Sequence, residues 1–221
     1  MNKGRGYIIL GAIAFGLALI YVLKNSMSKF KRKVLFQSNT ESKKWEDFNE
    51  TDPATSEIIQ DYWDRGVNLD YSISEIENYE WQSTHPWSAA FISWVMKVSG
   101  AGRHFLYSET HADYVIDAIE EKELNSKAKF KGYRIMEVKP EVTDIVCKRR
   151  LGSTADYAYG EDHTVLNNSP LHCDIVTKVN KKDIEVVGGN VNNKVDKANL
   201  SLDDKGYLNQ TDYFVLIRNT L

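Results

Sequence analysis

A serine that could act as a nucleophile, Ser88, stands at the start of a strongly apolar segment that continues to Gly100. Pro86 precedes it, and proline suits the first turn of a helix because its missing N–H would have no intrahelical partner there. The apolar residues recur at helical spacing, so we expect a buried helix. Unpaired backbone N–H groups at a helix start favour negative charge on an attacking oxygen. Ser88 is therefore a candidate nucleophile, the alternative being a serine that only caps the helix.

A serine hydroxyl needs a base to take its proton, and His172 is the leading candidate for that role. It stands at the entry to a predicted strand over residues 173–179, so only the fold could bring it to Ser88. Such a base needs a third group to fix its tautomer. Asp174 is one choice, because it lies two residues on and therefore on the same face of the strand. A histidine with a purely structural role is the alternative.

The stretch from Pro86 to Met96 reads Pro-Trp-Ser-Ala-Ala-Phe-Ile-Ser-Trp-Val-Met. It resembles the nucleophile helix of the CHAP and NlpC-type cell-wall peptidases and amidases, which carry cysteine at the position of Ser88. It is more similar to an uncharacterised bacterial domain family whose members look like CHAP domains and have serine there. Further blocks agree with that family in order over residues 52–218: Phe105-Leu106-Tyr107-Ser108 with His111-Ala112-Asp113-Tyr114, Asp144-Ile145-Val146-Cys147, His172-Cys173-Asp174-Ile175-Val176 and Gly188-Gly189-Asn190-Val191.

The resemblance implies a papain-like α+β domain that hydrolyses amide bonds in peptidoglycan. It makes Ser88 the nucleophile and His172 the general base. Nothing in the sequence demands a metal or other cofactor. The orienting residue of a CHAP domain lies on the following strand, which maps onto Asn190. Since Asn190 follows two glycines, it could instead occupy a turn with positive φ. The orienting role therefore stays open between Asn190 and Asp174.

Two residues near these blocks are expected to border the site without doing the chemistry: Trp87, beside Ser88, and His111, at the start of a predicted helix. Serine in place of cysteine removes an easily formed thiolate, so the site would depend on its base. This leaves a second function open, a non-catalytic domain that binds peptidoglycan or another partner. A third is a cytoplasm-facing enzyme that transfers acyl groups on lipid or protein.

The elements expected to position these residues change type along the chain. Helical patterns run from Thr51 to Gly66, from Pro86 to Gly100 and onward from Ser108. Alternating or β-rich segments follow at residues 133–138, 145–148, 173–179, 184–187 and 213–217. Helices followed by an antiparallel sheet indicate an α+β fold. The irregular segment at residues 149–171 is a candidate substrate-binding loop or lid.

The N-terminal part has the character of a membrane anchor. Residues 7–23 form an uncharged apolar run, at the short end of what spans a bilayer. A cleaved signal peptide is the alternative, but no small-residue cleavage site follows. We therefore predict a transmembrane anchor with basic flanks at residues 1–24, a polar tether at 25–50 and the folded domain at 51–221.

The charge distribution and the two cysteines limit which compartment and which partners are possible for this protein. Every charged residue before Glu41 is basic, so the acidic excess lies in the folded part, which argues against nucleic acid as a partner. Basic flanks after the span would favour a cytoplasmic domain, whereas a peptidoglycan substrate requires an extracytoplasmic one. Cys147 and Cys173 lie on predicted strands and could pair or stay reduced. Their spacing does not fit a zinc site.

Overall fold

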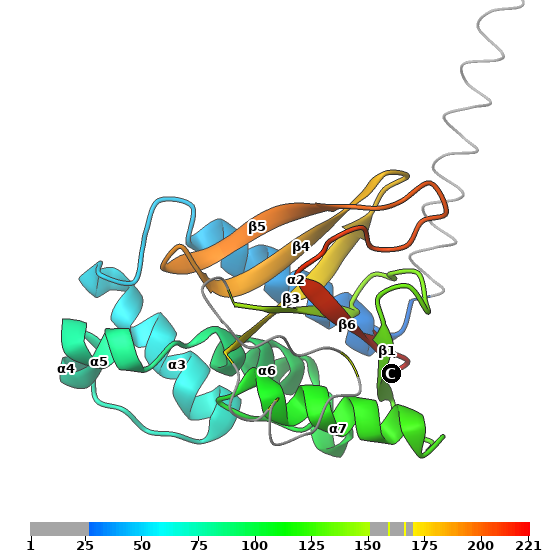
Figure 1. The fold of residues 1–221 in the computed structure, drawn as a ribbon. Helices are drawn as coiled ribbons and strands as arrows, with labels where there is room; N and C mark the ends of the chain where they lie inside the picture. The colour runs from blue at the N-terminus through cyan, green and yellow to red at the C-terminus, as the bar shows by residue number, and fades with distance from the viewer. Residues whose placement is uncertain (1–26, 151–158, 160–165, 167–169) are drawn as a thin grey trace, which may run out of the picture.

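The computed structural model describes residues 27–150, 159, 166 and 170–221. In this part the fold is α+β, with one antiparallel sheet in the order β1-β6-β2-β3-β4-β5 and helices packed against it (Figure 1). The strands are β1 Phe130–Arg134, β2 Ile145–Arg149, β3 Leu171–Val179, β4 Asp183–Val191, β5 Lys194–Ser201 and β6 Tyr213–Asn219. The helices are α2 Lys29–Lys44, α3 Ser56–Val67, α4 Ile73–Ile76, α5 Tyr79–Thr84, α6 Ser88–Ser99 and α7 His111–Glu123, with 3-10 turns η1 Pro53–Thr55 and η2 Gly102–His104.

Helix α6 is the centre of the helical layer, as its apolar sequence predicts. Every residue from Ser88 to Met96 is buried, and the helix ends at Gly100 in the left-handed conformation with φ 98°. It begins two residues after Pro86, with Trp87 at the N-cap position. Strand β4 approaches α6 so closely that a Cβ on Gly189 would lie 2.5 Å from Cβ of Phe91. Glycine at position 189 is thus what lets the helix lie against the sheet.

The two faces of the sheet support cores of different size. Cys173 and Ile175 on β3 point into the larger core, which they share with α6. Val176 on β3 and Val146 on β2 point into a smaller core on the other face. Because side chains alternate along a strand, His172 and Asp174 belong to this second face.

Helix α2 corrects the expectation of a polar tether at residues 25–50. The helix packs against α6 and against β3, β4 and β5, and in Figure 1 it lies along the sheet. Val34 and Trp45 are fully buried. The tether prediction was wrong because some buried positions of this segment are polar. Glu41, for example, accepts a hydrogen bond from the Tyr62 hydroxyl, so its burial leaves no apolar periodicity to read.

The strands predicted at 145–148, 173–179, 184–187 and 213–217 are present with shifted ends, and β5 is an addition. The strand predicted at 133–138 is largely wrong, because β1 ends at Arg134 and residues 135–138 form a turn. Strand β5 lies at the edge of the sheet beside β4 and buries only Val195 and Leu200. An edge strand with so few apolar residues lacks the alternation that identifies a strand in a sequence.

The two ends of the described domain meet. The Ser28 hydroxyl donates a hydrogen bond of 2.8 Å to the backbone carbonyl of Leu221. Residues 1–26, which include the predicted span at 7–23, lie outside the described residues. Within residues 27–150 and 170–221, no helix has the length and apolar character needed to cross a bilayer.

Candidate active site

Ser88 is the first residue of α6 and lies at the wall of a cavity of about 330 Å³. The cavity is lined by Pro86, Ser88, Ala89, Glu109, Thr110, His111, Ala112, Arg150, Pro170 and Leu171. Ser88 is 4% exposed, so its hydroxyl is shielded but reaches this space. Backbone N–H groups in the first turn of α6 have no intrahelical acceptor and are available near the hydroxyl. A small carbonyl group could therefore enter the cavity and meet both.

The imidazole that contacts Ser88 belongs to His111, the first residue of α7. The Ser88 Oγ and His111 Nε2 atoms are 2.7 Å apart, a normal hydrogen-bond distance. The other ring nitrogen, His111 Nδ1, is hydrogen-bonded to the hydroxyl of Tyr114, three residues along the same helix. Burial lowers the pKa of His111 well below its usual range, and the nearby His172 and Arg150 act in the same direction. His111 is therefore neutral at physiological pH.

His172 lies at the start of β3 and is hydrogen-bonded to Asp174 rather than to Ser88. Its Nε2 atom is 3.0 Å from Asp174 Oδ1, and the Tyr213 hydroxyl donates to Asp174 Oδ2, also at 3.0 Å. Burial alone would raise the pKa of Asp174, but the charge of His172 and the hydrogen bonds from His172 and Tyr213 outweigh it, so the pKa is lowered. Asp174 is a carboxylate that holds His172.

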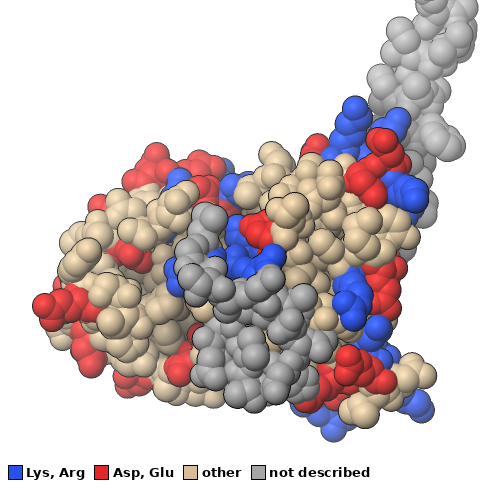
Figure 2. Space-filling view, in the orientation of Figure 1, with Lys and Arg blue, Asp and Glu red and all other residues tan. Residues whose placement is uncertain are grey.

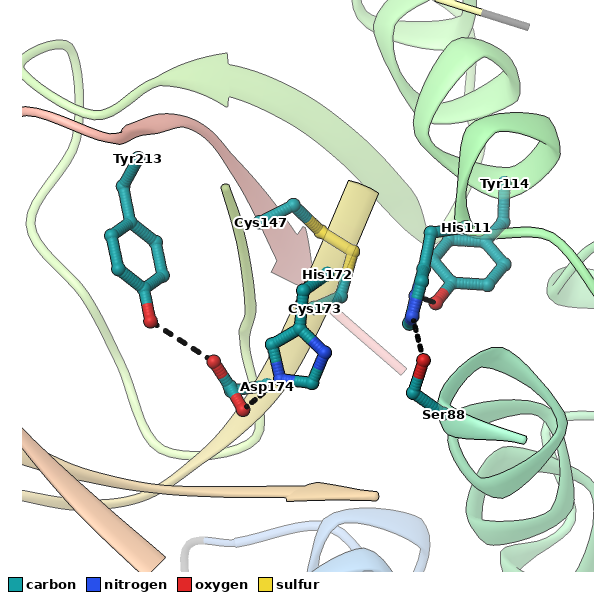
Figure 3. Close-up of a disulfide and its surroundings, with 8 residues drawn as sticks. All are labelled: Ser88, His111, Tyr114, Cys147, His172, Cys173, Asp174 and Tyr213. Atoms are coloured by element: carbon teal, nitrogen blue, oxygen red, sulfur yellow. Dashed lines mark hydrogen bonds and ion pairs between the residues drawn. A yellow bond between two sulfur atoms is a disulfide. The ribbon is translucent and has the colours of Figure 1, made fainter. Parts of the chain in front are cut away.

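The two histidines meet edge to face, which joins the two groups into one site (Figure 3). Their ring centroids are 5.6 Å apart with an interplanar angle of 69°. In Figure 3 the His172 nitrogen that does not contact Asp174 is directed toward His111 and Ser88. The sequence blocks around residues 88, 111 and 172 are thus brought together, although the direct partner of Ser88 is His111, which sequence reasoning placed only at the border.

Asn190 and Asp174 take different positions. Asn190 has φ 53° in a bulge of β4, where the register with β5 shifts between Gly188 and Val191. Among the described residues, the side chain that accepts a hydrogen bond from the His172 ring is Asp174. A Cβ on Gly188 would lie 2.1 Å from Asp174 Oδ1, so this glycine leaves room for the carboxylate. Of the two residues that the sequence leaves open, Asp174 is therefore the one that is hydrogen-bonded to His172.

Trp87, the residue before Ser88, is anchored by packing and by a hydrogen bond. Its ring is 1% exposed and stacks on Trp45 of the segment after α2, with ring centroids 5.1 Å apart. Its Nε1 donates a hydrogen bond of 2.8 Å to Glu50. Burial raises the pKa of Glu50, while the Trp87 bond and the charge of Arg150 act against that rise. Trp87 is thus a packing residue that fixes the start of α6.

A disulfide adjoins the site. Cys147 and Cys173 are directly opposite each other on β2 and β3 and are bonded, which resolves the pairing that their sequence positions left open. The bond joins the two strands one residue from His172. Figure 3 draws the disulfide together with His172, its neighbour in the chain.

Arg150, the residue after β2, is also among the residues that line this cavity. Figure 2 shows a group of basic side chains near the middle of the visible face, next to the grey atoms. The predicted loop or lid at 149–171 falls largely on residues outside the described part. Among the described residues, no cluster of His, Cys, Asp and Glu has the arrangement of a metal site.

The fold and the site together define a class of protein: an α+β domain in which a buried serine at the start of a helix contacts a histidine. The chain belongs to a bacterial family described as an uncharacterized protein conserved in bacteria (DUF2272), whose match covers residues 50–218. That match includes the serine, both histidines and Asp174, while α2 precedes it. No curated protein and no solved structure matches the chain.

Proposed function

We propose that this domain is a serine-dependent hydrolase of amide bonds with a papain-like arrangement, and that peptidoglycan is its substrate. The observation that carries the proposal is the meeting of Ser88 with two histidines at the wall of a cavity. Ser88 Oγ lies 2.7 Å from His111 Nε2, and the His111 ring is in edge-to-face contact with His172, which is hydrogen-bonded to Asp174. A hydroxyl, a base within reach and free backbone N–H groups are the parts that acyl transfer requires. The choice of peptidoglycan rests on the resemblance to CHAP and NlpC-type enzymes.

His172 and Asp174 supply the base in this proposal. A carboxylate can only accept hydrogen bonds, so the hydrogen between these residues belongs to His172 Nε2. The lone pair of neutral His172 is therefore on Nδ1, the side that faces His111 and Ser88 in Figure 3. This is the tautomer that a general base needs, with an acid holding the opposite nitrogen.

The disulfide favours an extracytoplasmic position for the domain. Disulfides persist in oxidising compartments and are rare in a reducing cytoplasm. Peptidoglycan lies on the oxidising side, so the substrate and the Cys147–Cys173 bond point the same way, against the tendency of the basic flanks. A reporter enzyme fused after Leu221 tests this, because activity that appears only with the cytoplasmic form of the reporter would contradict the proposed compartment.

Ser88 variants test the hydrolase. Purified full-length protein is incubated with peptidoglycan, and new amino and carboxyl groups are measured. We expect Ser88→Ala to lose activity by about three orders of magnitude or more, since members of such a site act together. Ser88→Cys should retain some, because a thiol ionises more easily. The matched control is Ser83→Ala, an exposed serine on α5. Equal release by wild type and Ser88→Ala would refute the proposal.

A binding domain is the second candidate, favoured by one specific observation. The histidine that contacts Ser88 has a tyrosine on its other nitrogen and not a carboxylate. A pull-down on the same peptidoglycan separates the two functions. If wild type, Ser88→Ala and Ser88→Cys all bind and none releases new groups, the domain is a binder.

A further inference from the structure

His111 has a fixed hydrogen-bond environment that decides which ring nitrogen carries the proton. The Tyr114 hydroxyl is fully buried and bonds to His111 Nδ1. Burial raises the pKa of Tyr114 well above its ordinary value, so the hydroxyl keeps its proton. Among the described residues, Nδ1 is the hydrogen-bond partner of that hydroxyl. A proton on Nδ1 would leave the buried tyrosine proton without an acceptor, at a cost of about 1–3 kcal/mol.

The hydrogen bond to Ser88 therefore has a definite direction. Tyr114 donates to Nδ1, neutral His111 carries its single proton on Nε2, and Nε2–H donates to Ser88 Oγ. A nitrogen that already carries a proton cannot accept the one from Ser88. His111 is thus close enough to be the base but is in the wrong tautomer for it. Because Ser88 Oγ accepts this bond, its own proton is free to be donated elsewhere.

The second imidazole has the opposite arrangement. Asp174 accepts from His172 Nε2–H, which leaves the lone pair on Nδ1. The two rings are in edge-to-face contact. The tautomer of each histidine is fixed by a different neighbour: a phenol for His111 and a carboxylate for His172. Toward Ser88, His111 therefore presents a protonated nitrogen and His172 an unprotonated one.

We propose that His111 is a neutral donor that stabilises negative charge on Ser88 Oγ, that Tyr114 is the positioning residue that holds it in this state, and that His172 alone takes the proton. The inference rests on the proposed hydrolase. The Ser88 proton passes to His172 Nδ1, directly or through one water. Oγ bonds to the carbonyl carbon, and the carbonyl electron pair moves to its oxygen. The C–N bond then breaks, and the leaving nitrogen takes the proton from His172. Water hydrolyses the resulting ester by the same route.

The charges around His111 support this division. Burial is the strongest influence against a positive charge on His111, and His172 and Arg150 also act against it. Asp174 acts in the opposite direction and favours that charge. Two adjacent imidazoles do not both become charged, so protonation of His172 keeps His111 neutral. A neutral donor at 2.7 Å needs no reorganisation while charge develops on the oxygen.

Nitrogen NMR on the full chain labelled with ¹⁵N-histidine tests the tautomer without any substrate. We expect His111 to show a protonated Nε2 and an unprotonated Nδ1 at neutral pH. Tyr114→Phe should shift the His111 nitrogens toward a mixture of tautomers and leave His172 unchanged. A protonated Nδ1 on His111 in the wild type would overturn the proposal. This readout holds even if the protein hydrolyses nothing.

Labelling by a fluorophosphonate tests the two roles. The Ser88 oxygen displaces fluoride from phosphorus, so the rate reports activation of the serine. A glutamine amide N–H can replace the Nε2–H donor of His111 but cannot act as a base. We expect His111→Gln to stay within about tenfold of the wild type, and His111→Ala to fall about 10²–10³-fold. His172→Gln should label as slowly as Ser88→Ala. His104→Ala, an exposed histidine of η2, is the control.

The outcomes separate the two proposals. If His111→Gln and His111→Ala both lose labelling completely while His172→Gln keeps it, then His111 is the base and the division of roles is wrong. If the wild type does not label at all, the hydrolase fails, and the nitrogen spectrum alone decides whether Tyr114 holds His111 as a donor.

Discussion

The two faces of the sheet hold their parts of the site by different means. Ser88 and His111 stand at the starts of two helices on the face with the larger apolar core, so packing positions them. His172 and Asp174 stand on one strand at the other face, so strand pairing and hydrogen bonds position them. Loss of packing should therefore mainly lower the free energy of unfolding. Loss of the polar contacts should mainly lower the reactivity of Ser88.

The largest effect should come from Asp174→Asn. An amide can donate to His172 as well as accept, so the fixed tautomer is lost, and labelling by the fluorophosphonate should fall on the order of 10³–10⁴-fold. Stability measured by urea unfolding should change much less. Asn190→Ala is the matched comparison and should stay close to the wild type. If Asn190→Ala loses labelling and Asp174→Asn does not, the orienting residue is Asn190.

A packing change at Trp45 should reduce stability by about 4 kcal/mol. Trp45 is fully buried, stacks on Trp87 and donates to the Tyr62 hydroxyl at 3.1 Å. Urea unfolding of Trp45→Ala measures the loss. Phe36→Ala, which changes a residue of α2 that is 66% exposed, should alter stability by less than about 0.5 kcal/mol. Similar losses in both variants would mean that α2 does not pack as described.

Removal of the disulfide should cost about 3 kcal/mol, because the bond closes a loop between positions 26 residues apart in the sequence. The double variant Cys147→Ala/Cys173→Ala is unfolded in urea with and without a thiol reductant. We expect the wild type to lose stability in reductant and the double variant to be unaffected by it. If complete reduction leaves the urea midpoint of the wild type unchanged, the disulfide contributes little to stability.

The smallest effect should be a pH dependence due to His111. Its pKa is lowered in the folded state, so its stability contribution is present above the unfolded value of about 6.5 and is lost as pH falls below it. The loss is at most about 1.4 kcal/mol per pH unit. Urea midpoints at pH 8 and pH 5 should therefore differ more for the wild type than for His111→Gln. If the change in urea midpoint between pH 8 and pH 5 is the same for both proteins, His111 does not contribute to the pH dependence of stability.

Asp174 and Asp144 also have shifted pKa values, and neither disturbs that comparison. The lowered pKa of Asp174 acts below about pH 4, its ordinary range. Burial raises the pKa of Asp144 to about 7, against the charge of Arg218, so its contribution is lost as pH rises from about 4 to 7. Asp144 is the same in both proteins, so it cancels from their difference.

The predictable parts of this fold are those with strong apolar periodicity. Helix α6 and strand β3 could be placed because their apolar residues recur at helical or strand spacing and most of their residues are buried. Helix α2 could not, because Ser38 and Glu41 occupy buried positions. Strand β5 could not, because it is a polar edge.

The site was predictable in its members more than in its contacts. Ser88, His172 and Asp174 follow from nucleophile, base and strand-face arguments. His111 was assigned only to the border, because acidic residues around it resemble ordinary compensation of a helix dipole. The signal that could have identified its role is Tyr114, three residues on and so on the same side of a helix as His111. No spacing in the sequence fixes which of two imidazoles a serine contacts, since that depends on how α7 meets β3.

The contact between Ser28 and the Leu221 carbonyl makes the described domain nearly a closed circle of chain. A short peptide linker could join these two positions without crossing the cavity or either core. New ends could then be opened in an exposed turn such as Asn180–Lys182, between β3 and β4. Such a rearranged chain would keep every strand neighbour while it changed the order of synthesis, so β4, β5 and β6 would be made first and β3, which carries His172, last.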